Sequence, residues 1–365
     1  MIPFLDLRRQ HAPLKRELMA ALERVVDSSQ FVLGAEGRAL EAELAVVCGV
    51  GHAAGVGSGT DALRLALSAL GIGAGDEVIT PAFSFVASAT TIMMTGATPV
   101  FADIDPHTYN VDVRAVERAI TDRTRAIMPV HLYGCPAPVD ELVALARARG
   151  LAVVEDAAQA IGATLHGRAI GSWGDAACLS FYPTKNLGAC GDAGMVVTNR
   201  ADVVERLRRL RHHGDGGRYR HVELGYCSRL DEMQAALLRV KLGRLQQWTD
   251  ARRRIAARYR EALAGLPLRL PVEPAGARHI YHLFTVSHPR RDTFIKALDE
   301  LGVGTAVHYP LPVPGQPVFG GGGEKEFPHA WRAAREVVSL PCFPELTDAE
   351  VAEVITAVRA ACARA

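Results

Sequence analysis

The chain has 365 residues, of which 49% are hydrophobic, and its 41 basic and 40 acidic residues give a formal charge of +1. This length and apolar content are sufficient for a large domain and a smaller one. The balanced charge lacks the electrostatic footprint of a protein that binds nucleic acid or an anionic membrane, so we expect a small molecule as the partner.

The first residues and the cysteines predict a cytosolic protein. The N-terminal segment carries early charges and has no apolar signal core. Residues 78–102 carry no charge, but Pro81, Gly96 and Pro99 interrupt them, which favours strand, helix and strand over a transmembrane helix. The seven cysteines form no Cys-x-x-Cys pair, so we expect reduced thiols and no metal site.

Short runs rich in Val and Ile alternate with helical periodicity along the first part of the chain. This pattern predicts an α/β fold with a mainly parallel seven-stranded sheet covered by helices. Ligands of such folds bind at the carboxyl ends of strands, where Asp156 and the loop of Lys185 are expected to lie. The expected strands cover residues 53–57, 77–80, 99–103, 125–131, 152–155, 178–182 and 195–198.

The second part of the chain predicts a linking helix and a smaller lobe. Met233, Leu237 and Val240 follow one another at spacings of four and three, which indicates a long helix from residue 230. We place the boundary near Trp248, with a large domain over 1–248 and a small α+β domain over 249–365. The expected elements of the small domain are helices over 252–263 and 292–301, a strand over 280–286 and a mobile surface loop over 309–323.

A glycine-rich segment, Gly55-Val-Gly-Ser-Gly-Thr-Asp61, follows the first expected strand and opens a helix. The free amides of a first helical turn can bind a phosphate, to which Ser58 or Thr60 would add a hydroxyl. The alternative is a tight turn in which Thr60 or Asp61 caps the helix. The segment has neither Gly-x-Gly-x-x-Gly spacing nor a Walker lysine, which argues against dinucleotides and triphosphates.

Asp156 and Lys185 supply the two groups that pyridoxal phosphate (PLP) requires. A desolvated lysine is a nucleophile toward a carbonyl, and a carboxylate keeps the pyridine nitrogen of PLP protonated. Gln159 would face the same pocket and bond the phenolic oxygen of the cofactor. The alternatives are a solvated loop for Lys185, a helix N-cap over 157–160 for Asp156 and a capping-box partner for Gln159.

Several segments together resemble the DegT/DnrJ/EryC1/StrS family of sugar aminotransferases, which are fold type I PLP enzymes. The resemblance runs nearly from end to end of the chain. The segments are Gly57-Ser-Gly-Thr-Asp-Ala-Leu63, Thr80-Pro-Ala-Phe-Ser-Phe85, Val130-His-Leu-Tyr-Gly134, Glu155-Asp-Ala-Ala-Gln159, Ser180-Phe-Tyr-Pro-Thr-Lys-Asn-Leu-Gly188, Arg229-Leu-Asp-Glu-Met-Gln-Ala-Ala236 and Tyr309-Pro310.

The resemblance implies a role for each matching residue. Lys185 would form the Schiff base with PLP and carry protons, while Asp156 pairs with the ring nitrogen and Gln159 with the ring oxygen. Phe85 would stack on the pyridine face, although Phe-Ser-Phe at a strand end is otherwise typical of a core. The residues implied to hold the phosphate are Gly59, Thr60 and Ser180.

The segment Gly225-Tyr-Cys-Ser-Arg229 departs from the family pattern. Family members usually have an asparagine at the position of Cys227, and its amide reaches the cofactor phosphate of the neighbouring subunit. A thiol is a weak hydrogen-bond donor, so either Ser228 or a water replaces the amide, or the affinity for the cofactor phosphate is lower. The alternative is that Cys227 is a small packing residue with no role at the phosphate. Arg229 is implied to bind the carboxylate of the amino donor, with a surface salt bridge as the alternative.

The resemblance implies a homodimer whose active sites are shared between the two chains. The enzyme would move an amino group from L-glutamate to a keto group of a nucleotide-linked sugar. This reaction belongs to the biosynthesis of deoxyamino sugars such as those of antibiotics. The phrase around Lys185 resembles the branch that aminates C3 of a dTDP-3-keto-6-deoxyhexose. C4 amination and a non-enzymatic regulator are the alternatives.

A dehydratase of the same group would replace Lys185 with histidine, and a desulfurase would need an activating base near Cys190. The residues expected at the sugar or nucleotide, each with a core or surface role as its alternative, are Tyr182, His213, Tyr219, His221, His308 and Tyr309.

Overall fold

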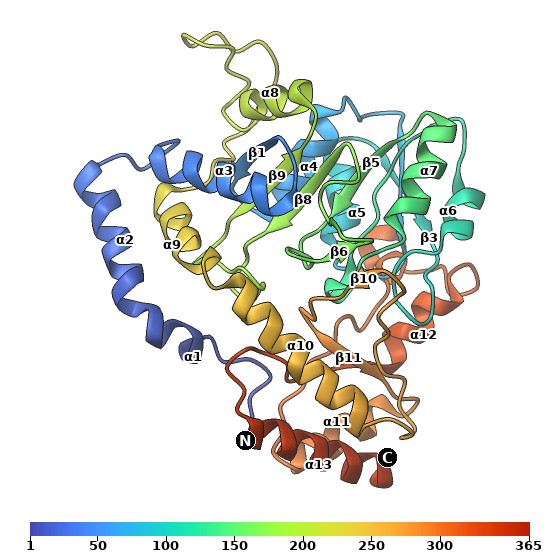
Figure 1. Ribbon diagram of the computed structural model, residues 1–365. Coiled ribbons are helices and arrows are strands. Elements are labelled where there is room, and N and C mark those ends of the chain that lie inside the picture. The colour runs from blue at the N-terminus through green and yellow to red at the C-terminus, as the bar shows by residue number, and fades with distance from the viewer.

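The computed structural model describes residues 1–365, and a seven-stranded sheet lies at the centre of its larger part (Figure 1). The strand order is β1-β9-β8-β5-β4-β2-β3. All pairings are parallel except those of β9, which runs antiparallel to β1 and β8. The predicted α/β class with a mainly parallel seven-stranded sheet is therefore confirmed. The strands are β1 (His52–Val56), β2 (Glu77–Pro81), β3 (Thr98–Ala102), β4 (Thr124–Ile127), β5 (Ala152–Asp156), β8 (Ala176–Ser180) and β9 (Gly194–Thr198).

Helices cover both faces of this sheet, and further helices form the N-terminal arm and the C-terminal part (Figure 1). No helix is both long enough and apolar enough to cross a membrane. The helices are α1 (Leu7–His11), α2 (Lys15–Ser28), α3 (Ala35–Cys48), α4 (Gly59–Ala69), α5 (Ala87–Met94), α6 (Val113–Ala119), α7 (Val139–Arg149), α8 (Ala201–Leu210), α9 (Glu232–Leu242), α10 (Leu245–Ala262), α11 (Arg291–Glu300), α12 (Pro328–Glu336) and α13 (Asp348–Arg364).

Burial on both faces explains why the strands are apolar without alternation. In β5, Val153 packs into a cluster with residues of α3 and α7, such as Leu44 and Leu142. Its neighbour Val154 points to the other face and joins a cluster with residues of α4 and α8, such as Leu207. A strand covered by helices on both faces reads as a continuous apolar run, which is what made β5 recognisable.

Two expected strands differ from those of the structure by more than two residues at one end. The strand expected over 125–131 ends at Ile127. The strand expected over 280–286 is β11 (Phe284–Ser287), which pairs with β12 (Val337–Leu340). Residues before β11 bond instead to a turn of the large part, because Ile280 donates to the carbonyl of Gly134 and Leu283 to that of Tyr133. The remaining short strands are β6 (Thr164–Leu165), β7 (Arg168–Ala169) and β10 (Ala277–Arg278), which form a three-stranded sheet.

The expected long linking helix is two helices, α9 and α10, separated at Gly243. The proposed boundary near Trp248 lies inside α10, which runs from the region of the sheet into the C-terminal part (Figure 1). Trp248 packs against Leu14 and Leu18 of the N-terminal arm, whereas Ile255 belongs to the C-terminal core. The division of the chain into two domains at this residue stays a prediction.

The proline- and glycine-rich stretch over 309–323 is not wholly a surface loop. It contains two short 3-10 turns, Val313–Gly315 and Pro317–Phe319. Val313 is buried and its amide donates to the carbonyl of Ala82, at 2.8 Å, directly after β2. This contact fixes the middle of the stretch against the sheet, so the expectation of a surface loop was wrong for that part.

Candidate active site

A cavity of about 420 Å³ lies where β1, β2, β5 and β8 end. Its position agrees with the rule that ligands of such sheets bind at the carboxyl ends of strands. The expected cofactor and substrate residues line it, except for five: His213, Tyr219, His221, Cys227 and Arg229. The expected residues that line the cavity are Gly59, Thr60, Phe85, Asp156, Gln159, Ser180, Tyr182, Lys185, His308 and Tyr309.

The glycine-rich segment connects β1 to the first turn of α4 at the cavity. Ser58 is the N-cap, and its Oγ accepts a hydrogen bond from the amide of Asp61 at 3.0 Å. The cap is therefore neither Thr60 nor Asp61, and Thr60 lines the cavity. A Cβ on Gly59 would lie 2.6 Å from the Cβ of Ser180, so glycine permits the close approach of α4 to β8. The amides that begin a helix have no partner within it, which makes this end of α4 suited to an anion.

Asp156 is the last residue of β5, and its carboxylate is buried in the cavity wall. Oδ2 accepts a hydrogen bond from Oγ of Ser88 at 3.0 Å, and Oδ1 accepts one from the amide of Ala158 at 3.2 Å. Burial raises the pKa of Asp156, while these two hydrogen bonds and the nearby Lys185 lower it. No helix follows over 157–160, so Asp156 is not a helix cap.

Lys185 lies in the loop that follows β8, and its side chain is half-buried in the cavity. Burial lowers the pKa of its amine to about 8, against a smaller opposing effect of the Asp156 carboxylate. The loop is held at two points, because the amide of Lys185 donates to the carbonyl of Tyr182 at 2.8 Å and Nζ of Lys241 donates to that of Gly188 at 2.7 Å. Lys185 is therefore not a solvated loop residue, and a larger fraction of its amine is neutral near pH 7 than in an exposed lysine.

Gln159 and two aromatic residues, Phe85 and Tyr309, also line the cavity. Oε1 of Gln159 accepts a hydrogen bond from the amide of Tyr133 at 2.7 Å, and Nε2 donates to the hydroxyl of Tyr309 at 3.0 Å. Gln159 thus has no capping role, and its amide retains a second N–H. The ring of Phe85 is half-exposed and lies 5.8 Å from that of Tyr309, so Phe85 is not an ordinary core residue.

A buried His131–Glu155 pair supports the end of β5 and was not predicted from the sequence. Nε2 of His131 lies 3.1 Å from Glu155, and Nδ1 accepts a hydrogen bond from the amide of Ala137. Glu155 also accepts hydrogen bonds from the amides of Gly171, Trp173 and Gly174, and the amide of His131 donates to the carbonyl of Asp156. The pair therefore fixes the backbone that presents the Asp156 carboxylate. Both residues belong to quoted motifs, but their contact depends on strand order.

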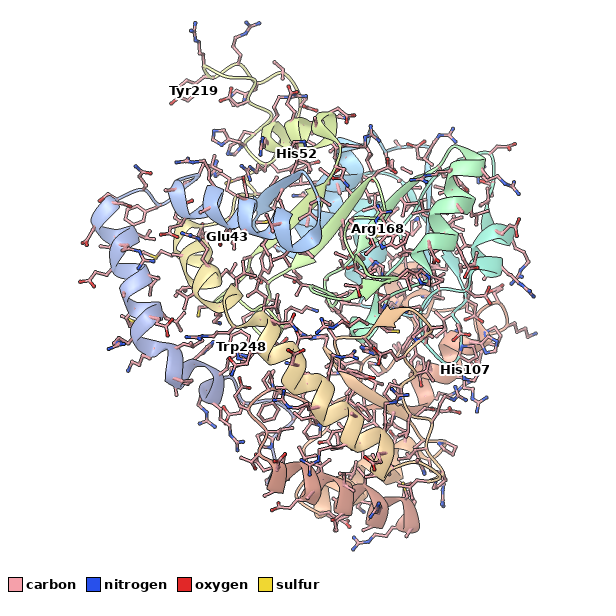
Figure 2. All side chains as sticks on the ribbon, viewed as in Figure 1. Glu43, His52, His107, Arg168, Tyr219 and Trp248 are labelled. Carbon is pink, nitrogen blue, oxygen red and sulfur yellow. The ribbon has the colours of Figure 1, made fainter.

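Cys227 and Arg229 lie outside the cavity of their own chain. Cys227 is exposed, and its Sγ lies 3.0 Å from a guanidinium nitrogen of Arg229. The other terminal nitrogen of Arg229 donates to Nδ1 of His212 at 2.8 Å, so this arginine makes no surface salt bridge. The preceding segment projects from the body of the protein with Tyr219 near its tip (Figure 2). The expected roles of Cys227 and Arg229 stay predictions, as do those of His213, Tyr219 and His221.

The cavity residues fit PLP. An amine of lowered pKa and a buried carboxylate face one cavity, the beginning of α4 supplies free amides for a phosphate, and Phe85 offers an aromatic face. The volume of about 420 Å³ is that of a small-molecule site. No group of three or more potential metal ligands gathers anywhere in the chain.

Comparison with known proteins agrees with this geometry. The model of the DegT/DnrJ/EryC1/StrS aminotransferase family matches residues 13–359. The chain is 49% identical over 358 residues to the UDP-N-acetyl-3-dehydro-alpha-D-glucosamine 3-aminotransferase of Acidithiobacillus ferrooxidans, covering 98% of this chain and 97% of the relative. It is 48% identical over 363 residues to the dTDP-3-amino-3,4,6-trideoxy-alpha-D-glucose transaminase of Streptomyces venezuelae, covering 98% and 95%.

Solved structures show the same fold. The X-ray structure of DesV from S. venezuelae in complex with a ketimine intermediate has a TM-score of 0.97 and 48% identity, covering 100% of this chain and 99% of that one. Other solved relatives include a PLP form and a form with PMP. The chain belongs to the DegT/DnrJ/EryC1/StrS aminotransferase family and is a PLP-dependent aminotransferase.

Proposed function

We propose that the enzyme transfers an amino group from L-glutamate to the C3 keto group of a nucleotide-linked sugar, a dTDP-3-keto-6-deoxyhexose. The supporting observation is that the two relatives described above, at 49% and 48% identity, both carry names that place nitrogen at C3 of a nucleotide-linked sugar. These names favour C3 over the alternative of C4. The phrase around Lys185 resembles the branch that aminates C3 of dTDP-3-keto-6-deoxyhexoses, and the deoxyamino sugar would be made in the cytosol, as a component of antibiotics.

The chain would supply proton transfer through Lys185 and charge stabilisation through Asp156, which line the same cavity. When bound, PLP supplies an electron sink for the bonds that change at the amino-bearing carbon. Nζ of Lys185 would take a proton from that carbon and deliver it to the C4′ position of the cofactor, a role that the lowered pKa of its amine favours near neutral pH. The Asp156 carboxylate would hold a proton on the ring nitrogen, and the hydrogen bond from the hydroxyl of Ser88 lowers the pKa of that carboxylate against the larger effect of burial.

We assign Tyr182, His308 and Tyr309 to the substrate because they line the cavity beside Lys185. The ring of His308 is neutral at pH 7, because burial and the charge of Lys185 lower its pKa to about 4. Its Nδ1 lies 3.0 Å from the hydroxyl of Ser339, and the hydroxyl of Tyr133 donates to its backbone carbonyl. A fixed neutral imidazole beside two phenols suits the hydroxyl groups of a sugar.

The functional unit we propose is a symmetric homodimer in which each site uses two chains. Cys227 and Arg229 do not line the cavity of their own chain, and the segment before them projects from the body (Figure 2). A partner related by a two-fold axis would receive this segment, with an interface of well over ~2,000 Å². A non-enzymatic regulator, the alternative, would not require Lys185 and Asp156 to line the same cavity.

A coupled assay with L-glutamate and a panel of keto-sugar nucleotides tests the proposal. The panel contains 3-keto and 4-keto sugars on both dTDP and UDP, and NMR of the products locates the new amino group. We expect the highest kcat/KM for a dTDP-linked 3-keto-6-deoxyhexose and no turnover by Lys185→Ala. Preference for a 4-keto sugar, or turnover with none of the panel, would contradict it.

A further inference from the structure

His282 lines the active-site cavity and has no role in the site described so far. Its ring is buried, and Nδ1 lies 3.0 Å from Oδ1 of Asn186, the residue that follows Lys185. With the amide oxygen of Asn186 turned toward the ring, this contact assigns the hydrogen to Nδ1, because an amide oxygen can only accept a hydrogen bond, and it leaves Nδ2 of Asn186 buried without a partner. In a neutral imidazole with its hydrogen on Nδ1, the other nitrogen, Nε2, is an acceptor.

The imidazole of His282 stays neutral at physiological pH. Burial lowers its pKa well below the usual value, and the positive charges of Lys185 and Arg252 lower it further. A protonated ring would carry hydrogen on both nitrogens and could not accept a hydrogen bond. The surroundings therefore preserve the acceptor.

The backbone around His282 is held in place from two sides. One guanidinium nitrogen of Arg252, in α10, donates to the carbonyls of Tyr281, His282 and Cys342. The amide of Leu283 donates to the carbonyl of Tyr133. With Asn186 on its ring, His282 has fixed backbone, side chain and tautomer, as expected of a preorganised binding group.

Nε2 of His282 has no hydrogen-bond partner in the protein. It is not among the side-chain nitrogens and oxygens that are sealed from solvent without a partner, and His282 itself lines the cavity. The same cavity holds Lys185, His308 and Tyr309. A fixed acceptor at this place can select a ligand that brings an O–H or N–H group, because one that lacks it leaves the acceptor unpaired.

We propose that Nε2 of His282 accepts a hydrogen bond from an O–H or N–H group of the bound substrate, with Asn186 fixing the tautomer that makes this possible. The inference rests on the proposed function, since the donor is either a hydroxyl of the keto sugar or the amino group of glutamate. Single-turnover kinetics of the two half-reactions separate these sources.

Two substitutions divide the roles of the two ring nitrogens. His282→Asn places an amide at the position of Nδ1, keeps a donor for Asn186 and removes the acceptor at Nε2. His282→Gln places an amide oxygen near the position of Nε2 and removes the donor to Asn186. His279→Asn is the matched control, because His279 is also buried but does not line this cavity, and Asn can still accept the hydrogen bond from the amide of Tyr281.

We expect His282→Asn to lower kcat/KM by about tenfold in one half-reaction, as for the loss of one hydrogen bond to substrate, with His282→Gln closer to wild type. A loss confined to the sugar half-reaction identifies the hydroxyl as the donor, and one confined to the glutamate half-reaction identifies the amino group. Equal losses for both variants, or no loss for His282→Asn, would overturn the proposal.

A second measurement does not depend on which sugar is the substrate. The ¹⁵N spectrum of the histidine-labelled holoenzyme should show His282 with hydrogen on Nδ1 and a bare Nε2. His282→Gln identifies the resonances. A resonance pattern with hydrogen on Nε2 would refute the assignment even if the keto-sugar panel yielded no substrate, so the two proposals fail independently.

Discussion

The hydroxyl of Ser88 donates a hydrogen bond to the Asp156 carboxylate, with Oγ 3.0 Å from Oδ2, and both side chains are buried. Ser88 lies on α5 and Asp156 at the end of β5, so the contact joins two elements that are distant in sequence. Its effect is electrostatic, because a donor to a buried carboxylate stabilises the ionised form. Asp156 must be ionised if it is to pair with a protonated ring nitrogen.

Ser88→Ala is expected to weaken PLP binding. Without this hydrogen bond the pKa of Asp156, already raised by burial, rises further, so the carboxylate becomes protonated at a higher pH. We expect a loss of ~1 kcal/mol, or about fivefold in Kd, that grows as the pH falls. The measurement is the Kd of PLP across a pH series. Ser68→Ala is the control, since Ser68 makes no side-chain hydrogen bond, and equal Kd values for both variants would contradict the role.

Lys185 should capture PLP with a pH dependence set by its lowered pKa. The neutral amine is the nucleophile, and burial brings the pKa from 10.5 to about 8, so the rate of capture by cofactor-free enzyme should rise through pH 8 and then level off. Stopped-flow absorbance measures the rate, and mass spectrometry after borohydride reduction locates the cofactor. Lys185→Ala should abolish capture, and Lys296→Ala, at an exposed position, should not. A rate that keeps rising toward pH 10.5, or labelling of Lys241, would refute the assignment.

The strands and the two reactive residues could be predicted from the sequence, whereas the contacts that tune them could not. β5 was recognisable because Val153 and Val154 are both buried, and Asp156 follows them directly. The Ser88 contact spans 68 positions and depends on how α5 packs against β5. Residues before β11 have apolar side chains suited to a strand, but their amides bond to the turn at Tyr133 and Gly134, which no local pattern reveals.

The position of His282 in the site could not be predicted for the same reason. Its partner Asn186 is 96 positions away, and thirteen histidines in the chain offer no local sign of which one lines the cavity. Cys227 and Arg229 are a different case. Their expected roles come from the family resemblance and require a second chain, so the geometry of one chain does not decide them.

Asp156→Asn should slow proton removal from the amino donor far more than it weakens PLP binding. An amide cannot hold the ring nitrogen protonated, and loss of such a preorganised charge lowers rates on the order of a hundredfold. Single-turnover absorbance with L-glutamate measures the effect. Asp103→Asn is the matched control, because Asp103 also follows a strand but accepts hydrogen bonds from the start of α12 outside the cavity. Asp192 would not serve as a control carboxylate, because it lines the cavity itself. An unchanged single-turnover rate would rule the role out.

Cys227→Asn should restore the phosphate contact that the family pattern implies. If the thiol leaves the phosphate of the neighbouring subunit short of one donor, an amide should tighten PLP by ~1 kcal/mol. Retention of PLP through dialysis measures the change. Cys227→Ala should differ little from wild type, because a thiol is a weak donor. Weaker retention by Cys227→Asn would mean that the pocket is built around a small residue.

Dimers with two different subunits test whether Arg229 serves the partner's site. One subunit carries Lys185→Ala and the other Arg229→Ala, and co-expression with two affinity tags allows the mixed dimer to be purified. If each site combines Lys185 of one chain with Arg229 of the other, one of the two sites is complete, and activity should be about half that of wild type. If Arg229 acts in its own chain, both sites lack an essential group and the mixed dimer is as inactive as the two parents. An active monomer in sedimentation at assay concentration would contradict the shared site altogether.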